Sequence, residues 1–385
     1  MENICDISKC LGCFACKSIC PKDAISVAED KLARTIPKVD NVKCIDCGLC
    51  SKICPVNNEK NWKDSKRCYA AYTKNDKDRN ECASGGIAST FARKIFEEEG
   101  LIVGSVFENG ILKQKLLSKN DNWEKIKGSK YVQSYTGKSY HDTKDALKNG
   151  KKVLYIGTPC QIDGLYSFLR NDYENLITVD LICHGTPPAK YLDEYCKSVS
   201  NNHSYTDVTF RGARDWDLSI YNKDVLLYAQ NCNIDLYFTA FLEGLSYREN
   251  CYKCPYAQPK RVSDITIGDF WGIDSEIEDL NHIQGMNMVL VNTNAGEKLL
   301  KDIDGKIQLF PRKLQEAITG NTTLKEPTKK EEEYESFWDA ISDKGFFEAV
   351  KKIYGVDHRK QFLKEKIKYL NRRVKSKIKS MLKWQ

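Results

Sequence analysis

Eight cysteines near the amino end fall into two copies of one spacing, C-x2-C-x2-C-x3-C, and a proline follows each copy. Three thiolates at consecutive x2 spacing and a fourth beyond them are ligands of a [4Fe-4S] cluster, and in two-cluster chains the fourth cysteine of each run serves the other cluster. The sequence therefore predicts two clusters with crossed ligands, one on Cys10, Cys13, Cys16 and Cys54 and the other on Cys44, Cys47, Cys50 and Cys20.

Other uses of clustered cysteines fit this spacing less well. A structural zinc ion takes four ligands, so three thiolates at x2 spacing crowd more sulfur than one zinc needs. A disulfide framework is typical of short secreted chains, and no signal peptide precedes the motif. The offset of 34 residues between the copies equals the period of one helical solenoid repeat, but two copies are too few to form a solenoid.

A second set of cysteines lies far from the first. Cys251 and Cys254 form a C-x2-C pair, which alone is compatible with a metal, a redox dithiol or simple burial. Cys160 and Cys183 each come shortly after an expected strand. We expect these four thiols to hold a third [4Fe-4S] cluster. The alternative is that Cys160 or Cys183 packs as a small apolar residue.

The elements that must position these thiols alternate between strand and helix patterns. Short β-branched runs predict strands at 101–107, 153–156, 176–182, 265–267 and 288–291, and helical periodicity predicts helices at 86–99, 161–170, 188–199 and 295–303. This alternation predicts an α/β domain with a largely parallel sheet. Ligands of such sheets bind at the carboxyl ends of the strands, where Cys160, Cys183 and Asp269 are expected.

The chain is long enough for three parts. We expect an α+β ferredoxin-like dicluster domain at 1–58, an α/β core domain at 66–325 and a helical C-terminal tail at 326–385, with a polar linker at 57–66. In the tail, residues 359–383 carry eleven basic side chains and one acid, which is more than the whole formal net charge of +7. The rest is mildly acidic, so no nucleic-acid surface is predicted.

The tail also repeats apolar residues at helical spacing from Phe362 to Leu382. A helix with one apolar and one cationic face suits an anionic membrane surface, and docking on the chain's own domain is the alternative. No apolar run is long enough to span a bilayer. Seventeen cysteines without a secretory leader favour a reducing compartment, so we expect a cytoplasmic protein that contacts the inner face of the membrane through its tail.

Two short blocks suggest an organic cofactor. Ser84, Gly85 and Gly86 open an expected helix, where backbone N–H groups can bind phosphate, although a plain N-cap turn is commoner. The second block offers a cation, a ring and two polar side chains for a flavin or substrate pocket, or else forms a solvated edge strand: Lys130, Tyr131, Gln133 and Ser134. His184 is a weak candidate for a general acid, and the alternative is an ordinary structural role. No G-x-G-x-x-G lies between a strand and a helix, so no Rossmann nicotinamide site is predicted.

Five blocks occur in the order found in one known family: SGGIAST from Ser84, GSKYVQS from Gly128, GTPCQIDGL from Gly157, LITVDLICHGTPP from Leu176, and CYKCPYA with RVSDITIGDFWG from Cys251. On the basis of these five blocks, the chain resembles the beta-subunit family of coenzyme F420 hydrogenase/dehydrogenase, in the bacterial branch with a fused two-cluster ferredoxin domain. The resemblance covers roughly residues 66–325.

The resemblance implies an oxidoreductase that moves electrons between iron-sulfur clusters and FAD. It implies core-cluster ligands at Cys160, Cys183, Cys251 and Cys254, and FAD contacts in the Ser84–Gly86 turn and the Lys130–Ser134 block, with Asp269 nearby. A ferredoxin-like donor or a partner redox subunit would supply electrons to a small organic substrate, in surface-polysaccharide or lipid-linked glycan synthesis. It does not establish the deazaflavin coenzyme as that substrate. An electron-transfer subunit of a larger complex and a polyferredoxin without flavin stay open.

Overall fold

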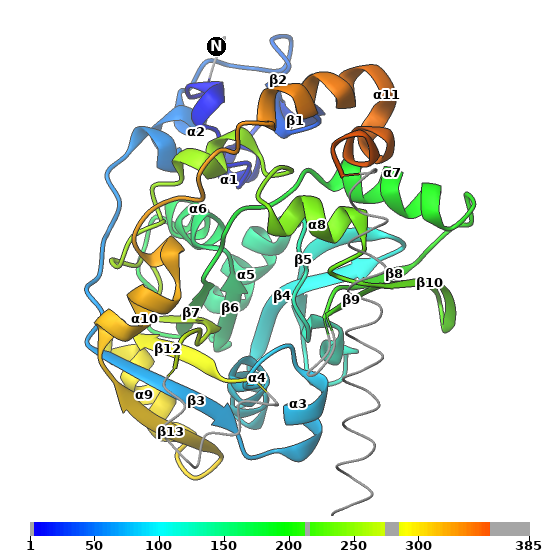
Figure 1. Ribbon diagram of the computed structural model, residues 1–385. Helices are drawn as coiled ribbons and strands as arrows, with labels where there is room; N and C mark the ends of the chain where they lie inside the picture. The colour runs from blue at the N-terminus through cyan, green and yellow to red at the C-terminus, as the bar shows by residue number, and fades with distance from the viewer. Residues whose placement is uncertain (1–3, 212–215, 274–284, 355–385) are drawn as a thin grey trace, which may run out of the picture.

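The computed structural model describes residues 4–211, 216–273 and 285–354. Within them, one eight-stranded sheet forms the centre of the molecule (Figure 1). Its strands, in spatial order, are β13 (Ile307–Arg312), β3 (Arg67–Thr73), β12 (Asn287–Val291), β11 (Ile265–Asp269), β7 (Leu176–Leu181), β6 (Val153–Gly157), β4 (Leu101–Glu108) and β5 (Ile111–Leu117).

The helices around this sheet are mostly short. They are α3 (Asp76–Glu81), α4 (Ile87–Glu97), α5 (Ser139–Lys148), α6 (Pro159–Leu169), α7 (Ala189–Val199), α8 (Leu236–Leu242), α9 (Asn294–Asp302), α10 (Leu314–Gly320) and α11 (Tyr334–Tyr354), with 3-10 turns η3 (Trp123–Ile126), η4 (Glu249–Lys253) and η6 (Thr322–Leu324). The predicted helices correspond to α4, α6, α7 and α9, within a few residues at each end.

The strand β6 shows why the sheet is covered on both faces. All five of its residues are buried, and successive side chains of a strand point to opposite faces. Val153 and Tyr155 share an apolar core with α5 and α6. Leu154 and Ile156 share another core with α4 and α9 on the opposite face. A strand buried on both faces reads as a continuous apolar run, as this one does.

The predicted parallel sheet is confirmed at its centre. The neighbouring strands β4, β6, β7 and β11 pair in parallel. The flanking strands β12, β3, β13 and β5 pair antiparallel with their neighbours, so the whole sheet is mixed. The carboxyl ends of β7 and β11 lie side by side, with Val179 opposite Ile265 and Leu181 opposite Ile267. Asp269, the last residue of β11, and Cys183, two residues after β7, therefore lie at the same edge of the sheet.

The amino-terminal segment folds as the predicted α+β ferredoxin-like unit. It contains η1 (Ile7–Lys9), α1 (Ala15–Ile19), the hairpin β1 (Ile25–Glu29) and β2 (Thr35–Val39), α2 (Leu49–Lys52) and η2 (Pro55–Asn57). In Figure 1 this unit lies at the top of the molecule, against α6. Leu11, Ala15 and Ile53 share an apolar core with Tyr140 and Leu165. The expected linker is also tied down, because the backbones of Lys63 and Arg261 exchange hydrogen bonds of 2.8 and 2.9 Å.

Beyond the central sheet, β8 (Asp207–Thr209), β9 (Asp217–Asn222) and β10 (Val225–Asn231) form a small antiparallel sheet. The helix α11 bends at Gly345 and packs on α7 and α8, where it buries Phe337 and Phe346. The amphipathic helix expected from Phe362 to Leu382 lies outside the described residues. None of the helices in the described ranges is long and apolar enough to cross a bilayer.

A buried carboxyl group in this region should make stability depend on pH. Asp235 caps α8 and accepts hydrogen bonds from Phe238 N, Tyr195 Oη and Tyr228 Oη at 2.8, 2.8 and 3.0 Å. Burial raises its pKa from 3.8 to about 6. The folded chain thus keeps a proton that the unfolded chain loses near pH 4, so stability should fall between those values, by up to about 3 kcal/mol, and stay level above them.

The variant Asp235→Asn cannot lose this proton and should not show the fall. In urea titrations at pH 5 and pH 7, the variant should therefore gain stability relative to the unchanged chain at the higher pH. A difference between the two proteins that stays constant from pH 5 to pH 7 would contradict the raised pKa.

Candidate functional site

The first cysteine set lines one cavity. We call Cys10, Cys13, Cys16 and Cys54 the cluster I set, and the cavity that they share also contains Cys5. The chain turns there through Gly12 and Phe14, which adopt φ of +64° and +56°. Burial raises the pKa of the Cys13 and Cys16 thiols. Ionised thiolates at this depth call for the positive charge of bound metal, which deprotonates its thiol ligands.

The second set, Cys20, Cys44, Cys47 and Cys50, lines a separate cavity and is called the cluster II set. The structure thus brings the cysteines together in the crossed grouping that the spacing predicts. The cluster II set lies nearer to solvent, because Cys47 is exposed and its neighbours Ile45 and Val42 are 57% and 96% exposed. A redox partner could therefore approach the cluster II set directly, whereas Cys10, Cys13 and Cys16 are buried.

The four remaining candidate cysteines also meet, and we call them the core set. Cys160 lies in the first turn of α6, Cys183 follows β7, and Cys251 and Cys254 lie in and after η4. Burial raises the pKa of the Cys183 thiol, and the nearby thiols of Cys251, Cys160 and Cys254 raise it further. Four neighbouring cysteines with soft sulfur donors are chemically suited to an iron-sulfur cluster or zinc.

One helix connects the cluster I set to the core set. Cys160 and Gly164 are four residues apart on α6, which places them on one face and about 6 Å apart along the helix axis. Gly164 is in contact with Cys13, since a Cβ atom at Gly164 would lie 2.8 Å from Cys13 Cβ and 3.0 Å from its Sγ. The two cysteine sets are therefore separated by about one turn of α6.

The predicted Ser84–Gly86 turn lies beside Asp269. Asn287 pairs with Asp269 across β11 and β12, and its Oδ1 accepts a hydrogen bond of 3.2 Å from the N–H of Ile87, the first residue of α4. Gly85 has no room for a side chain, because a Cβ atom there would lie 2.4 Å from the carbonyl oxygen of Ala71. Packing thus explains this glycine. Ser84 Oγ, by contrast, is buried without a hydrogen-bond partner among the described residues.

The two leading residues of the second block have separate surroundings, and Tyr131 lies near Asp269. Lys130 Nζ donates to the carbonyl oxygens of Lys125 and Lys127 at 2.9 and 2.6 Å, and burial lowers its pKa to about 7. The Tyr131 ring stacks on Phe241 with centroids 4.4 Å apart. It also lies beside the guanidinium of Arg211, which forms an ion pair of 2.5 Å with Asp269.

The other residues of that block have different surroundings. Gln133 Oε1 accepts a hydrogen bond of 3.0 Å from Thr35 Oγ1 of the ferredoxin-like unit, and Ser134 Oγ accepts one of 2.9 Å from Gln161 Nε2 of α6. Gln133 thus helps to join the ferredoxin-like unit to the core, and Ser134 holds the block against α6. His184 is exposed, and its carbonyl oxygen accepts a hydrogen bond from Thr328 Oγ1 at 2.8 Å.

Sequence reasoning missed several residues at this edge. The guanidinium carbon of Arg211 lies 4.0 Å from the ring centroid of Trp216, whose ring is 6.0 Å from that of Trp271. Arg211 Nε is buried and has no hydrogen-bond partner within the described ranges. Trp271 stands in the GDFWG stretch, two residues after Asp269, so its position could have been a signal. Arg211 belongs to no spaced motif.

Away from the cysteine sets, three acidic side chains belong to an ion-pair network. The carboxylates of Asp78, Glu81 and Glu124 come within 4.8 Å of one another. Lys127 Nζ lies 2.9, 2.7 and 3.1 Å from their oxygens, and Arg93 lies 2.7 Å from Asp78. Lys77 Nζ also lies 2.9 Å from Glu124, so three cations balance the three carboxylates.

Two family profiles match the chain. Residues 9–58 match the 4Fe-4S dicluster domain, and residues 150–314 match the C terminus of the coenzyme F420 hydrogenase/dehydrogenase beta subunit. Over residues 150–314, the chain is similar to that beta-subunit family. It is thus an iron-sulfur, electron-transfer protein related to the oxidoreductases of this family, with a fused dicluster domain.

Comparison with curated proteins gives no match. Among solved structures, a chain of the F420-reducing [NiFe] hydrogenase complex from Methanosarcina barkeri, studied by xenon derivatization, shares 20% identity with a TM-score of 0.41. The alignment covers 68% of this chain and 91% of that chain.

Proposed function

We propose that this chain is an iron-sulfur flavoprotein oxidoreductase that takes single electrons at its surface and delivers them to a small organic substrate in the core. One observation carries the proposal: the cysteine sets form a series from the exposed cluster II set, through the cluster I set, to the core set. Each set would hold one [4Fe-4S] cluster. The proposed extents of the parts are 1–58, 66–325 and 326–385.

Aromatic side chains continue this series toward Asp269. Tyr247 lies against Gly185, two residues after Cys183, since a Cβ atom at Gly185 would fall 2.3 Å from the Tyr247 ring. The centroids of Tyr247 and Phe241 are 5.4 Å apart, and those of Phe241 and Tyr131 are 4.4 Å apart. The core set is therefore connected by packed rings to the Tyr131 and Asp269 region.

The residues at this end of the series suit a flavin. Ser84 Oγ and Arg211 Nε are buried donors without partners among the described residues, and such groups call for a polar ligand. We propose that Ser84, Lys130, Tyr131 and Asp269, together with Arg211, contact FAD. A flavin converts the one-electron supply of clusters to two-electron chemistry. Gln133 and Ser134 would support this site through the domain contacts described above.

The proposed donor is a ferredoxin-like protein or a partner redox subunit, which would dock at the exposed rim of the cluster II set. The proposed substrate is a sugar or polyprenyl-linked intermediate of surface glycan synthesis, and it follows from the family resemblance alone. The proposed cytoplasmic location at the inner face of the membrane depends on the basic tail.

Reconstitution of the full chain without oxygen tests this function. Loading with iron, sulfide and FAD should give about twelve iron atoms, about twelve sulfides and one FAD per chain. A reduced ferredoxin should then bleach the flavin absorption. An iron content near eight would reject the core cluster, and a chain that binds no FAD would reject the flavoenzyme in favour of a polyferredoxin. A loaded chain that acts on small molecules only with a copurified partner would be an electron-transfer subunit.

A further inference from the structure

A buried arginine lies between the cluster I set and the core set. Arg248 is 2% exposed, and its guanidinium donates hydrogen bonds across the boundary with the ferredoxin-like unit. Nη1 donates to the carbonyl oxygen of Leu11 at 2.9 Å, and Nη2 donates to those of Cys10 and Thr35 at 3.3 and 3.4 Å. Its side chain is therefore anchored to the backbone of a cluster I cysteine.

The backbone of Arg248 is anchored to the core set. Its carbonyl oxygen accepts a hydrogen bond of 2.8 Å from the N–H of Cys251, and its own N–H donates to the carbonyl oxygen of Thr186 at 3.1 Å. Thr186 follows Cys183 by three residues. One residue thus touches the loops that present cysteines of both sets.

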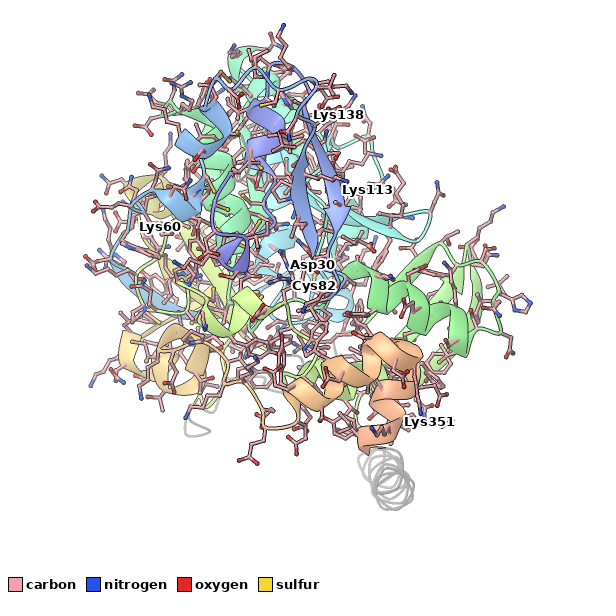
Figure 2. All side chains as sticks on the ribbon, turned by 90° about the horizontal axis from the view of Figure 1, so that it is seen from above. Asp30, Lys60, Cys82, Lys113, Lys138 and Lys351 are labelled. Atoms are coloured by element: carbon pink, nitrogen blue, oxygen red, sulfur yellow. The ribbon has the colours of Figure 1, made fainter. Side chains whose placement is uncertain are left out.

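An ion pair also crosses this boundary. Arg34 of the ferredoxin-like unit bonds Asp30 at 2.6 Å and Glu249, the residue after Arg248, at 3.1 Å. Figure 2 shows Asp30 near the middle of the view from above. Because Arg34 forms an ion pair with Glu249, the carboxylate next to Arg248 in the sequence already has a partner at the domain boundary.

The charge of Arg248 has no carboxylate partner. Within the described ranges, no aspartate or glutamate forms an ion pair with it, and its Nε lacks a hydrogen-bond partner. A buried cation is costly unless an anion compensates it. The loops that Arg248 contacts carry Cys10 of the cluster I set and Cys251 of the core set. Cluster-bound thiolates on these two loops would supply the compensating negative charge.

The guanidinium of Arg248 also packs closely against the backbone of Gly12. A Cβ atom at Gly12 would lie 2.3 Å from Nη1 and 2.7 Å from Nη2 of Arg248. Position 12 lies between Cys10 and Cys13, so the loop of cluster I closes directly over the charge.

We propose that Arg248 is a positioning residue shared by two clusters: its charge compensates the thiolates of the cluster I set and the core set, and it raises the reduction potentials of both clusters. The inference rests on the proposed core cluster. Reduction adds negative charge to a cluster, so a nearby fixed cation favours the reduced form. The cluster II set makes no contact with Arg248 in the described residues, and its cluster should be insensitive to this residue.

Redox titration of the reconstituted full chain, followed by electron paramagnetic resonance, tests the inference. In Arg248→Gln, the reduction equilibria of cluster I and the core cluster should each shift at least tenfold toward the oxidised form, which is about 59 mV for a one-electron couple. The cluster II potential should stay unchanged. A Cys47→Ser background, which alters a ligand of cluster II alone, assigns the signals.

Two further variants separate charge from folding. Arg248→Lys keeps the charge and should keep both potentials close to those of the unchanged chain. Arg312→Gln removes an arginine that pairs with Glu316 and should shift none of them. An Arg248→Gln protein with all clusters present and unshifted potentials would overturn the inference. If that variant loses its clusters, the lysine variant decides: a tenfold shift there would overturn it as well.

Failure of the proposed function gives a different result. A chain that holds only about eight iron atoms lacks the core cluster, yet its cluster I potential can still be compared between arginine, lysine and glutamine at position 248. A cluster I shift in such a chain would support the role of the charge while rejecting the third cluster.

Discussion

Replacing Cys251 and Cys254 together with serine should lower the iron content of the reconstituted chain from about twelve to about eight atoms. Both thiols belong to the core set, in which Cys183 interacts electrostatically with them and with Cys160. Serine is a poor ligand for iron in such a cluster, and two cysteines cannot hold it. Flavin reduction by a one-electron donor should be abolished, because the last step of the cysteine series is missing. Iron analysis and stopped-flow absorbance measure both effects.

A matched variant separates ligand loss from loss of buried thiols. Cys68 and Cys232 are also buried and free, at 6% and 8% exposure, and neither belongs to a cysteine set. Their double replacement by serine should leave the iron content and flavin reduction unchanged. If the Cys251 and Cys254 variant still reduced flavin at the normal rate, the core set would not be on the electron path.

Replacing Arg261 with methionine should lower the free energy of unfolding by about 3–5 kcal/mol, since it leaves a buried carboxylate without its cation. Arg261 is 2% exposed and lies 3.2 Å from Asp180 of β7, which is fully buried. It also donates to the carbonyl oxygen of Tyr256 at 2.9 Å, just beyond Cys254. The arginine thus fastens the C-x2-C loop to the central sheet. Urea titration without oxygen measures the loss.

A double variant tests the cause of that loss. Asp180→Leu in the Arg261→Met background removes the stranded charge, and apolar replacement of a whole buried pair is often close to neutral. We expect the double variant to recover more than half of the lost stability, with the rest owed to the unpaired carbonyl of Tyr256. A double variant less stable than Arg261→Met would show that the buried charge is not the main cause.

The ferredoxin-like unit and the central strands were predictable because their signals are local. The two cysteine runs carry their own ligand spacing, and the crossed grouping follows from that spacing without knowledge of the fold. The runs at 153–156 and 176–182 are apolar without alternation, which is typical of parallel strands buried on both faces. The structure confirms both as β6 and β7.

The antiparallel flanks were beyond local signals. β3 begins at Arg67, yet it pairs with β12 and β13, more than 200 residues later. Nothing in the run from Arg67 to Thr73 indicates such distant partners. Strand pairing is set by side chains that meet only in the folded chain. The sequence therefore predicted β12 as a strand but not its antiparallel pairing, and β3, β5 and β13 were missed.

The candidate site also contains residues that the sequence predicted and residues that it did not. Cysteine ligands can be recognised from their spacing. The block from Lys130 to Ser134 is an irregular loop, so no helix or strand periodicity indicates which of its side chains point to the same side. Tyr131 lies near Asp269, Lys130 bonds the carbonyl oxygens of Lys125 and Lys127, and Gln133 accepts a hydrogen bond from Thr35. Arg211 and Arg248 stand in no motif, and Arg261 opens the RVSDITIGDFWG block without a signal of its role. The importance of these arginines comes from carbonyls and carboxylates that they meet only in the folded chain.

The glycine at position 164 has a consequence for the rate of the proposed electron transfer. Gly164 lets Cys13 rest directly on α6, within about one turn of Cys160. Electron tunnelling slows exponentially as the gap between two carriers widens. A methyl group at this one position would meet Cys13 and Tyr140, so they would have to move away. On the proposed electron path, the lack of a side chain at position 164 would therefore favour fast transfer between the cluster I set and the core set.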